Sequence, residues 1–332
     1  MTNPVAPRPG MPKVLVTGAY GFVGGAYCRH LAALGVPHVG IVRTRHTDET
    51  RAEIIAVGDF ADADWTGPML EHDVDCVVHL AARSHRLVDD APDPLAAYRR
   101  DNVEATQSLL EAAKASAVSR FVFASSVKVH GEYTSPGLIW RESDAPDPRD
   151  DYARSKAEAE TWVREFSREH ALQTVILRFP LVYGPGVKAN FAVLVDAVRR
   201  RRWLPLGAIR NQRSLLGLDN ACSALDAART HPAAVGETFL VSDDDDVSTP
   251  ELVRAIADAF RVRPRMLSLS PRLLTLLLTL AFRRATARRL LESLAIDSAK
   301  IRRSLGWSPP STLDQELGRI AASLPSSPSA SR

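Results

Sequence analysis

The sequence predicts an α/β fold, in which a doubly wound parallel sheet carries a smaller C-terminal lobe. Runs of β-branched residues alternate with helical patterns through most of the chain, which is typical of parallel α/β architecture. A glycine-rich turn follows the first of these runs and precedes a helical pattern. After about residue 180 the elements become shorter and proline is more frequent. A chain of 332 residues can bury one large core or two moderate ones.

Six strands are predicted in the first part of the chain, mostly separated by helical patterns. In order they are KVLVTG (13–18), HVGIVR (38–43), EIIAVGDF (53–60), DCVVHLAA (75–82), RFVFASS (120–126) and TVILRFP (174–180). The predicted helices here cover 21–35, 94–116 and 152–170, and a later one begins at STPEL (248–252). The shift in pattern after this part suggests that the smaller lobe is laid over the first.

These patterns divide the chain into four segments. Residues 1–11 and 325–332 are predicted to be disordered tails, because they contain little that could pack. Residues 12–180 are predicted to form a dinucleotide-binding domain. Residues 181–324 are expected to form most of a substrate-binding lobe, with some exchange of chain between the two lobes.

Composition excludes several classes of partner. A net charge of +3 gives no argument for binding to nucleic acid or to a membrane surface. Cys28, Cys76 and Cys222 fit no disulfide or metal spacing and are expected to be buried thiols. No secretory signal opens the chain, so we expect a cytoplasmic protein.

Two local runs have simple interpretations. The apolar run LLTLLLTLAF (273–282) is too short to cross about 30 Å of hydrocarbon, so we expect no stable membrane insertion. The run Asp243–Asp246 lies between a strand-like segment and a helix start, so we expect a solvated turn rather than a metal site.

The turn GAYGFVGG (18–25) predicts a Rossmann-type dinucleotide site. The first glycine of such a motif permits a sharp turn, the second admits a pyrophosphate, and the third brings the helix close to the strand. The helix N-terminus adds its positive dipole end. The predicted contacts are Gly18, Gly21, Phe22, Val23 and Gly24.

The end of the second predicted strand bears on the choice of dinucleotide. Sites selective for NAD usually place an acidic residue there, where this chain has Arg43 and then Arg45. A guanidinium suits a 2′-phosphate, so NADP is favoured over NAD, although both arginines could simply be solvated. Asp59 and Phe60 close the third strand and are predicted to border the adenine.

Three further residues form a candidate catalytic group. Tyr152 and Lys156 are four apart on a predicted helix and so share a face. A nearby ammonium favours the phenolate and is expected to lower the pKa of Tyr152, which could then exchange a proton with a carbinol or a carbonyl. Ser126 ends a strand and could hydrogen-bond the reacting oxygen.

With these motifs the chain resembles the extended short-chain dehydrogenases/reductases, of the nucleotide-sugar epimerase, dehydratase and reductase type, from about Lys13 to about Leu324. The resemblance implies that HLAA (79–82) contributes Leu80, Ala81 and Ala82 to the cofactor site, with Asn102, Tyr152 and Lys156. It implies that Ser126, Tyr152 and Lys156 are catalytic, and that Asn190, Phe191 and Arg213 contact a nucleotide-linked substrate. Two positions depart from the family pattern, where His130 replaces a tyrosine and Leu181 an asparagine.

The resemblance implies NAD(P)-dependent redox chemistry at C4 of a UDP-hexose, in the manner of UDP-glucose 4-epimerases, for surface-polysaccharide sugars. An NADPH-dependent reductase of 4-keto UDP-sugars is the alternative, which Arg43 favours. A reductase of a non-sugar carbonyl and a non-catalytic dinucleotide sensor stay open. The family also implies a homodimer that pairs through helices at 95–115 and 152–170.

Overall fold

The computed structural model describes residues 13–45, 53–84, 91–270, 272–275 and 291–324. A seven-stranded parallel sheet with the order β10-β6-β5-β4-β1-β2-β3 forms its centre. These strands are β1 (Lys13–Thr17), β2 (His38–Val42), β3 (Ile54–Ala56), β4 (Val74–His79), β5 (Arg120–Ser126), β6 (Gln173–Phe179) and β10 (Thr238–Leu240). The predicted doubly wound Rossmann-type sheet is therefore confirmed.

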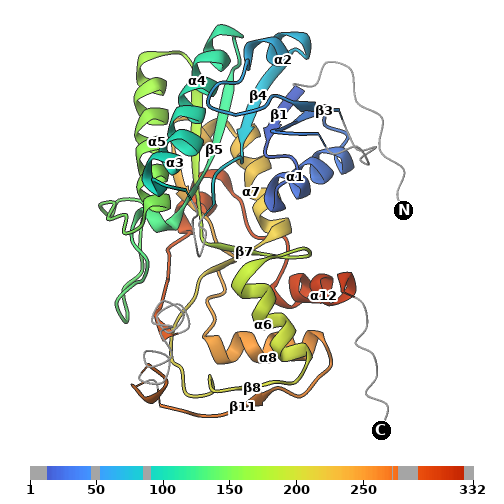
Figure 1. Cartoon of the computed structure of the whole chain (residues 1–332), viewed down its shortest axis with the longest axis vertical. Coiled ribbons are helices and arrows are strands. Elements are labelled where there is room, and N and C mark those ends of the chain that lie inside the picture. The colour runs from blue at the N-terminus through green and yellow to red at the C-terminus, as the bar shows by residue number, and fades with distance from the viewer. Residues whose placement is uncertain (1–12, 46–52, 85–90, 271, 276–290, 325–332) are drawn as a thin grey trace.

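Helices cover both faces of the sheet (Figure 1). Alternate residues of one strand point to opposite faces, so Val14 and Val16 pack in one core and Leu15 packs in the other. The helices against the first core are α1 (Phe22–Ala33), α7 (Leu218–Thr230) and α11 (Ala299–Leu305). Those against the second core are α2 (Thr66–Glu71), α4 (Ala105–Ala115) and α5 (Asp151–Glu169).

The strand order reverses between β1 and β4, which are neighbours in the sheet. From β1 the chain winds outward through β2 and β3, and from β4 it winds the other way through β5 and β6. Ligands of open α/β sheets bind at this reversal, outside the carboxyl ends of the strands. The topology therefore places a candidate site above Thr17 and His79.

The predicted helix over 94–116 is present but interrupted. It consists of α3 (Pro94–Arg99), a single π-helical turn η1 (Arg100–Glu104) and α4. Such turns are frequent at functional sites. This one buries the polar side chains of Asp101 and Asn102, which the apolar pattern of the sequence did not indicate.

After β6 the chain leaves the sheet and later returns to it. The part farthest from the sheet contains α6 (Ala189–Arg199), α8 (Thr249–Ala259) and α12 (Leu313–Ser323), which share a separate core. Its short strands are β7 (Leu181–Tyr183), β8 (Trp203–Leu204), β9 (Leu215–Gly217) and β11 (Arg265–Met266). Two 3₁₀ turns lie elsewhere, Val127–Val129 directly after β5 and Pro232–Ala234 between α7 and β10. Both β10, which completes the sheet, and α7, which packs against it, follow residue 180 in the sequence.

The acidic run at 243–246 is a solvated turn only in its middle. Asp244 and Asp245 are exposed, whereas Asp243 accepts hydrogen bonds from Tyr183 (2.8 Å) and Gly217 (2.7 Å). Asp246 accepts one from Ser214 at 2.5 Å. The prediction was wrong for the two ends because their partners, in β7, in β9 and at Ser214 just before β9, are remote in sequence. No metal-binding group of His, Cys, Asp or Glu occurs among the described residues.

The other local expectations have mixed outcomes. Cys28, Cys76 and Cys222 are free and buried, as predicted, and burial raises the pKa of each thiol to about 12. Most of the apolar run at 273–282 lies outside the described residues, as do both predicted disordered tails. No helix in the described parts of the chain has the length and apolar character needed to span a bilayer.

Glu316 is a buried carboxyl at the contact between α12 and α7. Its Oε1 accepts a hydrogen bond from the Asp219 amide at 3.2 Å and lies 3.3 Å from Arg319, while Oε2 has no partner. Burial, assisted by the charge of Asp219, raises the pKa of Glu316 to about 7. A carboxyl shifted in this direction stabilises the fold while it is protonated, and that stability is lost as the pH rises through about 7.

We expect Glu316→Gln, which mimics the protonated side chain, to raise the free energy of unfolding by about 2 kcal/mol at pH 8 and much less at pH 5. Urea unfolding at both pH values measures the difference. Glu237→Gln is the control, because the Glu237 side chain is 43% exposed and its ion pair with Lys300 lies at the surface. A gain for Glu316→Gln that is the same at both pH values would contradict the assignment.

Candidate active site

Thr17 joins the ends of β1 and β4 at the point where the strand order reverses. Its Oγ1 accepts hydrogen bonds from the backbone amides of Leu80 (3.1 Å) and Ala81 (3.0 Å). It therefore donates to Nδ1 of His79 at 2.7 Å. On its other side, Nε2 of His79 lies 3.2 Å from Oγ1 of Thr106 in α4. Burial lowers the pKa of His79 to about 3, so this link is neutral.

The predicted glycine turn lies directly above this link, and at Gly18 and Gly24 there is no room for a side chain. Gly18 has φ +71°, and a Cβ there would lie 3.0 Å from Cα of Ala81. A Cβ on Gly24 would lie 2.1 Å from the carbonyl oxygen of Gly18. Gly21 caps α1, so the first amides of this helix, including those of Phe22 and Val23, are available to an anion. The bare backbone at a helix N-terminus fits the pyrophosphate of a dinucleotide.

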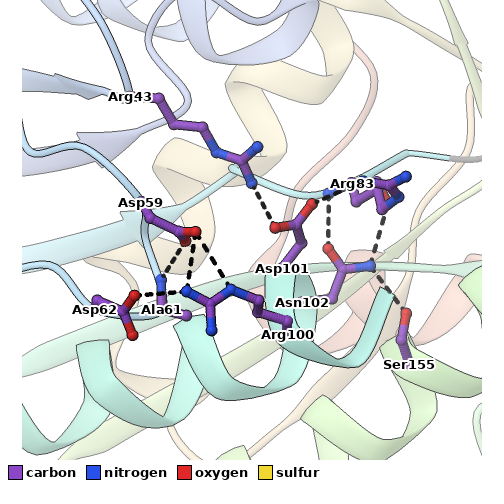
Figure 2. A network of polar contacts seen from close by, with 9 residues as sticks. All are labelled: Arg43, Asp59, Ala61, Asp62, Arg83, Arg100, Asp101, Asn102 and Ser155. Atoms are coloured by element: carbon purple, nitrogen blue, oxygen red, sulfur yellow. Dashed lines mark hydrogen bonds and ion pairs between the residues drawn. The ribbon is translucent and has the colours of Figure 1, made fainter. Parts of the chain in front are cut away.

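Charged residues surround the carboxyl ends of β2 and β3 (Figure 2). Arg43 is half-exposed, lies 2.9 Å from Asp101, and stands over the ring of Phe60 at 5.5 Å. Phe60 itself is buried against Trp65, with ring centroids 5.2 Å apart. Arg43 is therefore partly solvated but held by both a carboxylate and an aromatic ring.

Asp59 belongs to the second half of this network. Its carboxylate accepts a hydrogen bond from the Ala61 amide (3.1 Å) and lies 3.1 Å from Arg100, which also binds Asp62 at 2.5 Å. The Ala61 amide and the Arg100 guanidinium hold the pKa of Asp59 below its usual range. The Asp59 carboxylate is thus ionised and binds Arg100 of η1. Its contact with an adenine stays a prediction.

Asn102 is buried and bonded mainly to the protein. Its Nδ2 donates to the Arg83 carbonyl (3.2 Å) and to Oγ of Ser155 (2.9 Å), and its Oδ1 accepts from the Arg83 amide at 2.7 Å. Ser155 in turn donates to the Tyr152 carbonyl at 2.8 Å. Asn102 therefore fixes the loop that holds Leu80, Ala81 and Ala82 against the start of α5, and its predicted contact with a cofactor is not tested by this geometry.

The structure brings Ser126 and Tyr152 together. Ser126 is the last residue of β5, and Tyr152 lies in the first turn of α5, which Asp150 caps by accepting from the Ala153 amide at 2.7 Å. The Ser126 hydroxyl lies close enough to the Tyr152 phenol to lower its pKa. The ring of Tyr98 in α3 packs against the ring of Tyr152, with centroids 6.2 Å apart and planes inclined at 61°.

Lys156 lies one helical turn beyond Tyr152 and is buried. Its Nζ is 4.1 Å from the centroid of the Phe123 ring. Burial lowers the pKa of Lys156 to about 7, and the charge of Glu160 opposes this shift. Burial thus favours the neutral amine of Lys156 more than water would.

The expected lowering of the Tyr152 pKa was wrong. The pKa of Tyr152 is raised to about 12, because burial disfavours the phenolate more strongly than the Ser126 hydroxyl favours it. In this state the phenol is protonated and suited to donating a proton. Taking a proton at neutral pH requires additional positive charge near the phenol.

A buried charge network behind Lys156 was missed by the sequence analysis. Glu160 pairs with Arg178 of β6 at 2.6 Å and with Arg164 at 2.5 Å. Nη1 of Arg178 donates to Nε2 of His130 at 2.7 Å, and the His130 ring stacks on Trp140 at 5.7 Å. The spacing of Tyr152, Lys156 and Glu160 by four residues was the available signal. His130, which departs from the family pattern, thus has a structural partner.

The predicted substrate residues lie in the part of the chain beyond β6. Asn190 is exposed in the first turn of α6, directly after Ala189, whose φ of +55° marks strained backbone. Phe191 is buried, and its ring stacks on Tyr183 at 5.3 Å. Arg213 is half-buried between the bridges to Val247 and Leu294. Their contacts with a substrate stay predictions.

The comparisons with known proteins agree with this architecture. The model of the "NAD dependent epimerase/dehydratase family" matches residues 14–242. The chain belongs to this family. The resemblance to extended short-chain dehydrogenases/reductases is thereby confirmed, and the family consists of enzymes.

Individual members of the family resemble the chain over nearly its whole length. A UDP-glucose 4-epimerase of Vibrio cholerae is 38% identical over 315 residues, which cover 94% of this chain and 95% of the relative. A solved structure of MoeE5 with UDP-glucuronic acid and NAD has a TM-score of 0.75 at 26% identity, covering 93% and 98% of the two chains. RMD from Pseudomonas aeruginosa, complexed with NADPH, has a TM-score of 0.72 at 25% identity, covering 94% and 98%.

The glycine turn gives a direct test of the phosphate site. We expect Gly24→Ala to lower the free energy of unfolding by about 2 kcal/mol or more and to weaken dinucleotide binding, because the added methyl group overlaps the Gly18 carbonyl. Urea unfolding and calorimetric titration with NADH and NADPH measure the two effects.

Gly318→Ala in α12 is the matched control, since a Cβ there meets nothing within 4 Å. That substitution should be neutral or stabilise the fold by up to about 1 kcal/mol. If Gly24→Ala behaved like this control, the close approach of α1 to β1 would not be required.

Proposed function

We propose that the protein carries out NAD(P)-dependent redox chemistry at C4 of a nucleotide-activated hexose, as a UDP-sugar 4-epimerase. The observation that carries this proposal is that Ser126, at the end of β5, lies beside Tyr152 in the first turn of α5, with Lys156 one turn behind. The similarity to the Vibrio cholerae UDP-glucose 4-epimerase supports the substrate class. Biosynthesis of surface-polysaccharide sugars is the proposed context.

The dinucleotide, when bound, supplies the acceptor and donor of hydride for the C4 carbon. Tyr152 takes the proton of the 4-hydroxyl as the carbonyl forms, and returns it when the carbonyl is reduced. Ser126 donates a hydrogen bond to the same oxygen, where negative charge develops. Lys156 provides positive charge that favours the phenolate, which burial alone disfavours.

The cofactor is held by the glycine turn, the α1 N-terminus and the loop after β4. Solved relatives bind either NAD, as in MoeE5, or NADPH, as in RMD. Arg43 supports binding of NADP through its 2′-phosphate. It thereby also supports the second candidate function, the reduction of a 4-keto UDP-sugar with NADPH. Asn190, Phe191 and Arg213 are proposed to bind the nucleotide end of the sugar, with Arg213 on its phosphates.

A homodimer that pairs through α3, α4 and α5 is also proposed. The large apolar side chains of Leu95 and Trp162 are exposed on these helices, with exposed fractions of 37% and 42%. Burial of such side chains in an interface is favourable.

We expect Tyr152→Phe to reduce turnover at least about 100-fold, because the variant lacks the hydroxyl that transfers the proton. Its affinity for NADH should stay within about threefold, since the ring and the glycine turn are retained. Steady-state kinetics and calorimetry give the two numbers. A variant that kept about a tenth of the rate would show that another group transfers the proton.

The reaction is tested by incubating the protein with UDP-glucose and other UDP-sugars, with and without NADPH. Absorbance of the reduced nicotinamide and the sugar products are followed together. Interconversion of 4-epimers without net change of the cofactor supports the epimerase. Stoichiometric consumption of NADPH with a 4-keto sugar supports the reductase instead. Absence of both reactions, with dinucleotide binding intact, would contradict the proposed function.

A further inference from the structure

The guanidinium that would bind a 2′-phosphate is already bound by a carboxylate of the same chain. Nη2 of Arg43 lies 2.9 Å from Oδ1 of Asp101, and Nη1 of Arg83 lies 3.3 Å from Oδ2 of the same carboxylate. Asp101 thus connects two arginines that come from the ends of β2 and β4 (Figure 2). Its side chain is 11% exposed, compared with 49% for Arg43.

The charges around this position cancel. The network contains three arginines and three aspartates, namely Arg43, Arg83, Arg100, Asp59, Asp62 and Asp101. A 2′-phosphate arriving here brings up to two negative charges and would stand near the Asp101 carboxylate. Like charges repel, and Arg43 cannot direct the same N–H groups at both acceptors.

The position of Asp101 depends on the π-helical turn. Asp101 lies within η1, where its side chain is buried rather than directed to solvent. Two guanidiniums and the surrounding fold hold the Asp101 carboxylate in place. No entropy is therefore lost in ordering this carboxylate when it competes with a 2′-phosphate for Arg43. An internal, preorganised acceptor competes more effectively than a mobile one.

We propose that Asp101 is a specificity-determining residue, which weakens binding of NADP relative to NAD by occupying Arg43. This inference rests on the proposed function only in assuming that a nicotinamide dinucleotide binds above the glycine turn. It concerns the adenosine end of that dinucleotide and leaves the chemistry at Tyr152 unchanged.

The test compares dissociation constants for NADH and NADPH, measured by calorimetry, in the full-length wild type and in Asp101→Asn. The variant keeps the size of the side chain and an acceptor for Arg83 but removes the charge. We expect NADPH to bind about tenfold more tightly and NADH to change less than about twofold. In an Arg43→Ala background the same substitution should no longer favour NADPH, because there is no guanidinium to release.

Asp62→Asn is the matched control. It removes an equal charge from the same network, but Asp62 pairs with Arg100 and not with Arg43. Its effect on the ratio of the two affinities should therefore be small. Asp101→Glu, which keeps the charge, should retain the ratio of the wild type. If Asp101→Asn does not fold, Asp101→Ser removes the same charge and carries the same expectation.

The proposal is overturned if Asp101→Asn, or Asp101→Ser in its place, leaves the ratio of affinities unchanged, or if Asp62→Asn shifts the ratio equally. These outcomes differ from a failure of the proposed function. If the proposed function failed, the wild type would bind neither dinucleotide, or would bind them without acting on UDP-sugars.

Discussion

The hydroxyl of Thr17 holds together the ends of the two strands between which the sheet reverses its winding. It accepts two amides from the chain after β4 and donates to His79, which continues the link to α4. Because Gly18 follows Thr17 directly and packs on Ala81, the width of the crevice is set at this point. The glycine turn, the loop that Asn102 fixes and the start of α5 are all positioned relative to it.

A second constraint is the burial of charge along one face of α5. Tyr152, Lys156 and Glu160 succeed one another at intervals of one turn, and all three are affected by desolvation. Burial raises the pKa of the phenol and lowers that of the ammonium, while two arginines keep Glu160 ionised. The phenol of Tyr152 is thus held in a site where small changes of nearby charge have large effects.

Much of this arrangement could be read from local patterns in the sequence. The strands of the main sheet before residue 180, the glycine turn and the juxtaposition of Ser126 with Tyr152 follow from periodicity, spacing and the rule that strand ends meet at one edge. The charge partners could not be predicted in this way. Asp101 meets Arg43 only because a π-helical turn occurs in the predicted helix, and Asp243 meets Tyr183 across 60 positions of sequence. The pKa of Tyr152 depends on its burial, which spacing does not reveal.

The late position of β10 in the sequence affects how the sheet forms during synthesis. It pairs with β6 but is synthesised about sixty residues later, after the chain has passed through α6 and β9. During synthesis on the ribosome, β6 therefore emerges as an unprotected edge that can accept a strand from another molecule. A fragment that ended near residue 180 would keep that edge exposed, and we expect it to aggregate rather than to behave as an autonomous nucleotide-binding module.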